Sequence, residues 1–161
     1  MKTKKQQNSN LSSKLKDVFT DLSVDIFGYE KMVSKNIIKR TNYISHRIKI
    51  PTELLFIRIF QVEHQIKSFL YEREKPISTI ATEDLAYFFL DEQTAAITNI
   101  KNKIAFSIKQ YLKDFAEANR IDENSVRIWI QVKEKKVYVR AFQGEEFIKQ
   151  IPLNTLIKYF K

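Results

Sequence analysis

Residues 125–151 read SVRIWIQVKEKKVYVRAFQGEEFIKQI, and this stretch decides the predicted fold. Apolar side chains recur in it at every second position, which is the period of a β-strand that buries one face. Turns at Glu134 and Lys135 and again at Gly144 divide the stretch into three parts. It therefore predicts a three-stranded antiparallel meander.

The two faces of this meander differ in composition. The face expected to lie inward is aliphatic and carries Val126, Ile128, Ile130, Val132, Val137, Val139 and Ala141. The opposite face interleaves aromatic and basic side chains, namely Arg127, Trp129, Gln131, Lys133, Tyr138, Arg140 and Phe142. A first hairpin that turns symmetrically places Trp129 beside Arg140, and it also pairs Arg127 with Phe142 and Gln131 with Tyr138.

Aromatic rings interleaved with cations are typical of a stacking platform for single-stranded nucleic acid. The candidate platform consists of Arg127, Trp129, Tyr138, Arg140 and Phe142. The alternative is a second buried face, in which the three rings pack under helices and the basic groups extend to the solvent.

Composition indicates one folded domain. The chain has 161 residues, of which 43% are hydrophobic and 12% aromatic, so it can bury a core. It contains two Gly and no Cys, which excludes glycine-rich phosphate loops, disulfides and thiolate metal sites. No stretch approaches the ~20 apolar residues that span a bilayer, and no signal peptide is visible. We expect no membrane partner and a cytoplasmic location.

The net charge of +9 is unevenly distributed. Residues 1–16 contain five lysines and no acid, and residues 31–52 contain six basic side chains and no acid. Basic blocks bind phosphate in a salt-dependent way. Lysine nevertheless outnumbers arginine 21 to 7, a composition that an AT-rich coding sequence produces without selection for binding.

A basic block within residues 31–52 supplies the second group of candidate residues. Lys39, Arg40, Arg47 and Lys49 are expected to contact phosphate, with Tyr43 beside them. The alternative is a solvated basic surface without a ligand.

The rest of the chain predicts mainly helices. The expected elements are a helix from Ser12 or Ser13 to Gly28, a helix over 31–42, a strand over 43–50, a helix over 52–70, a loop at Pro76, a short helix from Thr82, a long helix from 97 to about Asn119 and a last helix from Pro152. A strand over 54–60 competes with the third helix. No internal repeat is visible.

We therefore predict an α+β fold, with mainly helical N-terminal three-quarters packed on the C-terminal three-stranded antiparallel meander and a final short helix. Residues 1–12 are predicted to be a basic flexible tail, and 13–161 a single α+β domain.

Residues 69–124 resemble the helical core-binding domain of tyrosine recombinases. The resemblance rests on a Thr-Glu-Asp-Leu helix start at Thr82, the phenylalanines that follow it and the sequence Ile-Asp-Glu-Asn that ends at Asn124. The 37 residues that follow are too few for the catalytic domain of that family, so its chemistry is not expected here.

No catalytic motif stands out. The two histidines, His46 and His64, lie in different predicted elements without acidic neighbours at ligand spacing, so neither a zinc site nor catalysis is expected. Each pair of adjacent acids falls at a predicted helix start or turn: Glu83 and Asp84, Asp91 and Glu92, Asp122 and Glu123, and Glu145 and Glu146.

The sequence thus favours a small non-catalytic protein, without cofactor or metal, that binds RNA or DNA, preferably single-stranded. The alternative is a protein-interaction or assembly subunit of a larger complex of the mobile-element or phage type, with the aromatic face docked on a protein partner.

Overall fold

The computed structural model describes the backbone of residues 12–160 and the side chains of residues 28–160 apart from Thr98. Contacts divide the chain into two compact units, Met1–Lys31 and Met32–Lys161. Over the described residues, one six-stranded antiparallel sheet is accompanied by five α-helices. The predicted tail, residues 1–12, lies almost wholly outside this range.

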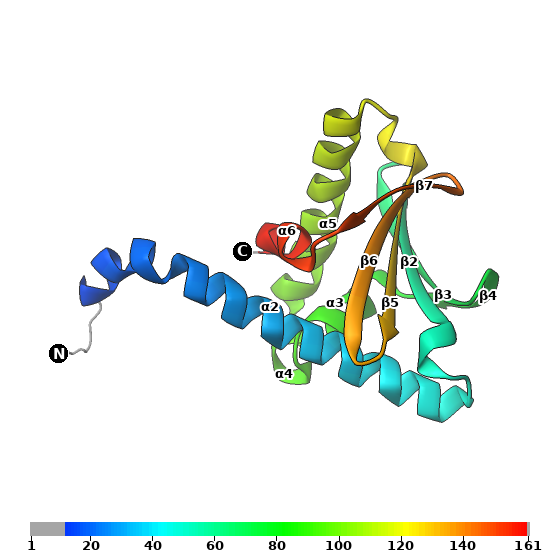
Figure 1. Ribbon diagram of the computed structural model, residues 1–161, viewed down its shortest axis with the longest axis horizontal. Helices are drawn as coiled ribbons and strands as arrows, with labels where there is room; N and C mark the ends of the chain where they lie inside the picture. The colour runs from blue at the N-terminus through cyan, green and yellow to red at the C-terminus, as the bar shows by residue number, and fades with distance from the viewer. Residues whose placement is uncertain (1–11, 161) are drawn as a thin grey trace. The chain divides into compact units, whose positions relative to one another are not determined.

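The sheet consists of two consecutive meanders joined at its centre, in the order β4-β3-β2-β5-β6-β7 (Figure 1). The strands are β2 Leu55–Val62, β3 Gln65–Glu72, β4 Lys75–Ile80, β5 Val126–Lys133, β6 Lys136–Gln143 and β7 Glu146–Ile151. The helices are α2 Ser12–Ile48, α3 Thr82–Phe89, α4 Glu92–Ala95, α5 Thr98–Asn119 and α6 Leu153–Ile157. Short 3-10 turns are η1 Thr52–Leu54, η2 Glu123–Ser125 and η3 Lys158–Phe160.

The C-terminal part of the prediction is confirmed. Strands β5, β6 and β7 follow one another as a meander, and Trp129 pairs with Arg140. The other predicted pairs, Arg127 with Phe142 and Gln131 with Tyr138, are also present. The short helix α3, the long helix α5 that ends at Asn119 and the final helix α6 lie where the sequence predicts them.

The α+β class is right, but the prediction of mainly helical N-terminal three-quarters is wrong. Residues 55–80 form three strands instead of a helix and a loop, so the competing strand over 54–60 is the better interpretation. Both faces of β2 carry large apolar side chains, which hides the alternation of a strand. Pro76 lies in the edge strand β4, where a missing backbone N–H is tolerated. The resemblance to a helical domain fails for the same reason, because residues 69–80 are strands.

Two further predictions fail in α2. The helix runs through Gly28 without stopping, and it includes most of the stretch that we expected to be a strand over residues 43–50. The buried face of α2 follows from Val33, Ile37 and Thr41, which are spaced four residues apart and are at most 2% exposed. The alternation of Ile44, His46 and Ile48 is therefore coincidental.

The two meanders repeat one structural unit, offset by 71 residues. We define the first unit as residues 40–89 and the second unit as residues 111–160, a division that differs from the two contact-defined units. The elements β2, β3, β4 and α3 begin at residues 55, 65, 75 and 82, and β5, β6, β7 and α6 each begin 71 residues later. The offset also relates the ends of α2 and α5, at Ile48 and Asn119. The expectation of no internal repeat is therefore wrong, because the repeat lies in the backbone and few side chains are shared.

Irregular backbone features obey the same offset. Positive φ angles among the described residues occur in counterparts, namely Lys49 and Arg120, Glu63 and Glu134, His64 and Lys135, and Arg73 and Gly144. A hydrogen bond joins each second turn to the residue before the first strand of its meander, from Arg73 N to Leu54 O and from Gly144 N to Ser125 O, both at 2.8 Å. Register shifts occur at Leu70/Tyr71 and at their counterparts Ala141/Phe142.

A pseudo-twofold axis passes through the centre of the sheet. Arg58 and Trp129 are counterparts in the two units, and they also face each other across the β2–β5 pair. The buried side of the sheet contacts α3, α5 and α6, with Ile59 and Ile128 in its middle. Figure 1 shows α5 and α6 on one side of the strands. The opposite face of the sheet holds the candidate site.

Candidate nucleic-acid interface

The structure brings the five predicted platform residues together on the outer face of the sheet. Arg127 and Trp129 extend from β5, and Tyr138, Arg140 and Phe142 extend from β6. All five are half-buried, whereas the alternate positions on the same strands are mostly buried. The predicted segregation of the two faces is therefore present.

A row of stacked side chains crosses this outer face. It contains Tyr71, Arg58, Trp129, Phe142 and Phe147, one from each of the strands β3, β2, β5, β6 and β7. The Arg58 guanidinium lies 3.8 Å from the centroid of each of the Tyr71 and Trp129 rings. Trp129 stacks on Phe142 at 4.3 Å between centroids, and Phe142 meets Phe147 edge to face at 5.6 Å. We call these five side chains the central row.

The central row determines what the aromatic rings expose. Trp129 packs closely on Arg58 and on Phe142, and it also meets Phe56 edge to face at 5.5 Å. These contacts account for its half-buried state and leave ring edges as its accessible part. Phe147, at the end of the row, is 54% exposed. The outer face thus offers an open ring at one end and ring edges between cations elsewhere.

The flanks of the central row differ on its two sides. On one side Phe60 and Phe69 stack at 5.5 Å, and the Arg127 guanidinium lies 4.5 Å from the Phe60 centroid. On the other side Arg140 Nη1 donates to Gln131 Oε1 at 3.0 Å and the guanidinium lies over Tyr138 at 5.2 Å. One flank is therefore a pair of aromatic rings with one cation, and the other is a polar cluster of Arg140, Gln131 and Tyr138.

Arg58 occupies an unusual electrostatic position. Burial lowers the pKa of its guanidinium, while the phenol of Tyr71 and the charges of Glu74 and Glu145 act in the opposite direction. Arg58 Nη2 donates to Arg73 O at 3.4 Å, and Arg58 Nε is buried without a hydrogen-bond partner. This arginine is held mainly by ring faces, so part of its donor capacity is unused.

Sequence reasoning missed half of this face. The missed members are Phe56, Arg58, Phe60, Phe69, Tyr71 and Phe147. The first five lie in β2 and β3, which were predicted to be helical. The available signal was the order Phe56, Arg58, Phe60 at alternate positions, which matches the spacing of Arg127, Trp129 and Gln131.

The second predicted group lies at the C-terminal end of α2, on a different element from the first group. Arg40 lies over the rings of Tyr43 and Tyr87, at 5.7 and 5.4 Å from their centroids. Arg47 Nη1 donates to Tyr43 Oη at 3.2 Å, and its guanidinium also lies over the Tyr43 ring. Lys49 is the left-handed residue that follows the helix. Lys39 and Arg40 are helical as predicted, whereas Tyr43 and Arg47 are helical in place of the expected strand.

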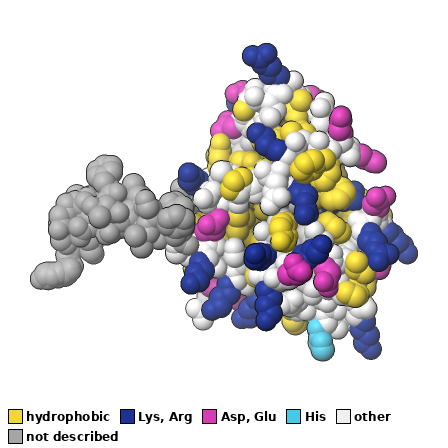
Figure 2. Space-filling model, viewed as in Figure 1, with side chains coloured by type: hydrophobic (Ala, Val, Ile, Leu, Met, Phe, Trp, Pro, Cys, Tyr) yellow, Lys and Arg dark blue, Asp and Glu magenta, His cyan; other side chains and the backbone are white. Residues whose placement is uncertain are grey.

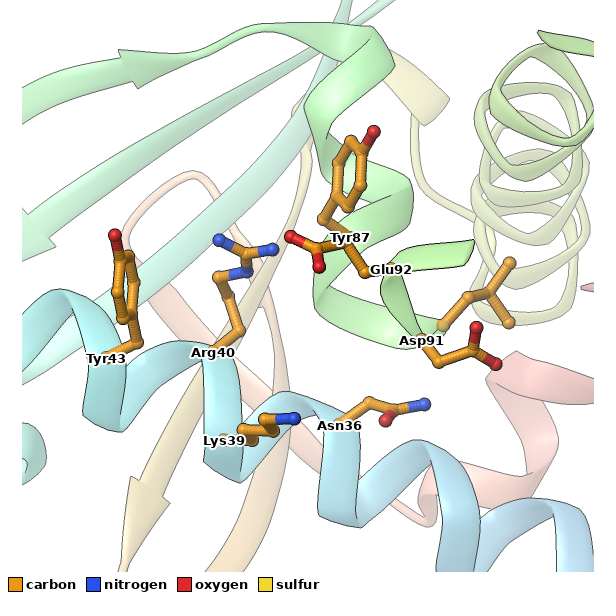
Figure 3. A pocket seen from close by; sticks show the side chains of 8 residues that line it. Asn36, Lys39, Arg40, Tyr43, Tyr87, Asp91 and Glu92 are labelled. Atoms are coloured by element: carbon orange, nitrogen blue, oxygen red, sulfur yellow. The ribbon is translucent and has the colours of Figure 1, made fainter. Parts of the chain in front are cut away.

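A pocket of about 270 Å³ lies between α2 and the segment that contains α3 and α4. Figure 3 shows Arg40 between the rings of Tyr43 and Tyr87, with Glu92 near its guanidinium and Lys39 below. Asn36 Nδ2 donates to Phe89 O at 3.1 Å and ties α2 to α3. Cations and acids both line this pocket, so it is not a purely basic phosphate site.

The two histidines have ordinary surroundings. His46 is exposed on α2 instead of lying on the apolar side of a strand, and His64 is exposed in the turn between β2 and β3. Over the described residues, no group of three or more His, Cys, Asp or Glu side chains could hold a metal ion.

The surface carries mixed charge. Figure 2 shows Lys and Arg side chains interspersed with acidic and hydrophobic ones on the side seen in Figure 1. None of the helices in the described part of the chain is long and apolar enough to cross a membrane.

Comparisons with protein-family models, with curated proteins and with solved structures found no match for this chain.

Proposed function

We propose that this protein is a small non-catalytic protein that binds single-stranded nucleic acid on the outer face of its sheet. The observation that carries the proposal is the central row, in which four aromatic rings and one cation, Arg58 between Tyr71 and Trp129, contact one another in sequence across five strands. Such a surface offers the open ring of Phe147 and the edges of the other rings to bases, and it offers cations to the backbone.

Basic side chains surround the central row and supply the charge that the proposal needs. Arg127 and Arg140 lie on the same face, beside Phe60 and Tyr138. Lys67, Lys133 and Lys136 occupy exposed outward positions on β3, β5 and β6. Each phosphate that such a cation neutralises releases counterions, which favours binding at low salt.

The cations at the end of α2 form a second, separate surface in this proposal. Lys39, Arg47 and Lys49 are exposed, so they remain accessible to phosphate. Arg40 is instead half-buried between Tyr43 and Tyr87, which makes it a weaker candidate. A long strand could contact both surfaces, whereas a short one would need only the sheet face.

The decisive experiment is fluorescence anisotropy with labelled single-stranded RNA, single-stranded DNA and duplex DNA across a salt series. We expect single strands to bind more tightly than the duplex and the affinity to fall steeply with salt. Absence of binding at low salt would remove nucleic acid from consideration, because the electrostatic contribution is largest there.

A second candidate function, a protein-interaction subunit, is favoured by one observation. A groove of about 600 Å³ lies between α2, β4 and α3, with Ile44, Ile48, Leu70 and Phe88 among its lining residues. The second unit has aromatic side chains at the corresponding place. Tyr111, Phe115 and Tyr159 are the counterparts of Arg40, Ile44 and Phe88, and Tyr111 contacts both other rings. Binding of a protein through the apolar part of this groove would depend less on salt than phosphate binding does.

A further inference from the structure

Arg58 occupies the pseudo-twofold position that Trp129 occupies in the other unit, and it is the cation of the central row. Its planar guanidinium is covered on both sides, by Tyr71 and by Trp129, each at 3.8 Å. A ligand therefore meets Arg58 in the plane of the guanidinium and not above it. Planar groups with acceptor atoms on one edge suit this geometry.

The hydrogen bonds of Arg58 leave donors for such a ligand. A guanidinium has five N–H donors; Nη2 reaches Arg73 O at 3.4 Å and the guanidinium also hydrogen-bonds the Tyr71 side chain, which leaves further donors on the terminal nitrogens. Nε is enclosed and unpaired, so the terminal nitrogens are the groups that can reach a ligand. Two parallel N–H donors match two neighbouring acceptors on a planar edge.

The surrounding charge favours a neutral ligand over an anion at this point. Glu74 and Glu145, counterparts in the two second turns, both interact electrostatically with Arg58. Their negative charge opposes the approach of a phosphate or a carboxylate but affects an uncharged base edge much less. The cations that suit phosphate, such as Arg127 and Lys133, lie elsewhere on the outer face.

Guanine presents the matching edge, because its O6 and N7 are adjacent acceptors in the ring plane. Resting on the proposed function, we infer that Arg58 gives the outer sheet face a preference for guanine, by donating two in-plane hydrogen bonds to O6 and N7. Tyr71 and Trp129 hold the guanidinium in the required plane. Adenine presents a donor where guanine presents O6, and thymine lacks N7, so both fit less well.

The test compares three labelled oligonucleotides in anisotropy: thymine only, thymine with one central guanine, and thymine with one central 7-deazaguanine. We expect the guanine probe to bind the full-length protein about tenfold more tightly than the thymine probe, within the range of a bidentate base contact. The 7-deazaguanine probe should lose most of that preference, because it lacks one acceptor.

Arg58→Lys is the test variant, and Arg127→Lys on the same face is its matched control. Arg58→Lys should reduce the guanine preference to less than about twofold, since a lysine cannot donate two parallel hydrogen bonds. Arg127→Lys should weaken all three probes alike and keep the preference. Circular dichroism checks the fold of both variants, and if Arg58→Lys is unfolded the 7-deazaguanine probe decides with the unaltered protein.

The outcomes separate this inference from the proposed function. Equal, salt-sensitive affinity for all probes would overturn the guanine preference and leave single-strand binding standing. A loss of affinity in Arg58→Lys that is equal for all probes would make Arg58 a general charge contact and also overturn it. If no probe binds but an acidic peptide binds through Arg58, both proposals fail and the ligand is a protein carboxylate.

Discussion

The two structural units of the sheet share a backbone but differ in the side chains that they present. Their strands, turns, left-handed residues and register shifts coincide after a shift of 71 residues. At the pseudo-twofold centre, however, the first unit has Arg58 and the second has Trp129. Turn geometry and buried positions therefore define the fold, whereas the side chains on the outer face can differ between the two units.

The two units also differ in whether a groove lies between the long helix, the edge strand and the short helix that follows it. The first unit leaves a groove between α2, β4 and α3. In the second unit, Tyr111 contacts both Phe115 and Tyr159 at the corresponding positions. Aromatic side chains thus occupy the second unit where the first has Arg40, Ile44 and Phe88. Four predictions test how far the equivalence of the two units extends.

The largest effect is expected in the core. Leu85 and its counterpart Leu156 are 0% and 1% exposed, so Leu85→Ala and Leu156→Ala should each lower the free energy of unfolding by about 2–5 kcal/mol. Urea denaturation measures both, with Thr79→Ala on the exposed strand β4 as a control that should change it by less than about 0.5 kcal/mol. A cost that is large for one leucine and negligible for the other would break the equivalence.

The next effect concerns binding by the second unit. Trp129→Ala removes the centre of the central row and should weaken single-strand binding by about 1–3 kcal/mol. Phe106→Ala is the control, because Phe106 is a 62% exposed aromatic on α5 and not on the sheet face. Anisotropy measures both variants. Unchanged affinity of a folded Trp129→Ala protein would exclude the row as the binding surface.

A smaller effect is expected at the second turns. Arg73 and Gly144 have φ angles of 54° and 60°, and an added Cβ at Gly144 meets no atom within 4 Å. Gly144→Ala should therefore cost about 1 kcal/mol through backbone strain alone, whereas Arg73→Gly should be neutral or stabilising by up to about 1 kcal/mol. Thermal unfolding of the two variants gives the signs, and a stabilising Gly144→Ala would contradict the shared turn geometry.

The smallest effect belongs to a hydrogen bond found in the second unit. Tyr159 Oη donates to Asp114 Oδ2 at 2.6 Å, and the counterparts of these residues are Phe88 and Tyr43. This bond raises the pKa of Tyr159 to about 12. Tyr159→Phe should cost about 0.5 kcal/mol at neutral pH, a low figure because the pair is exposed.

The pH dependence of this bond has a definite sign. The folded pKa lies above the ordinary tyrosine value of 10, so the stabilisation is complete below pH 10 and is lost as the pH rises through about 12. Ultraviolet absorbance follows the phenolate, and Asp114→Asn is the control that should return the pKa toward 10. A titration of Tyr159 near 10 in the unaltered protein would show that the bond is absent in solution.

Sequence reasoning succeeded in the second unit because its signals were unmixed. Polar and basic side chains alternate with aliphatic ones in β5, and Gly144 marks a turn. In the first unit the same turn position is Arg73, which is not a usual residue for a positive φ angle. Large apolar side chains on both faces of β2 also hid the alternation of a strand, so the segment was predicted to be a helix.

The candidate site was predictable to the same extent. Trp129, Tyr138, Arg140 and Phe142 were placed on one face because their strands were recognised. Arg58 and Tyr71 were missed because contacts between distant strands bring them to Trp129, and no local pattern records such contacts.

The β2–β5 pair also has a consequence for the origin and integrity of the molecule. Each unit on its own would end at a bare strand, with unsatisfied backbone donors and acceptors along β2 or β5. Covalent linkage of two copies supplies the missing neighbour at a high effective concentration, as a fused dimer does. Cleavage of the chain between the units would recreate that open edge, so a separated half should seek another half or aggregate.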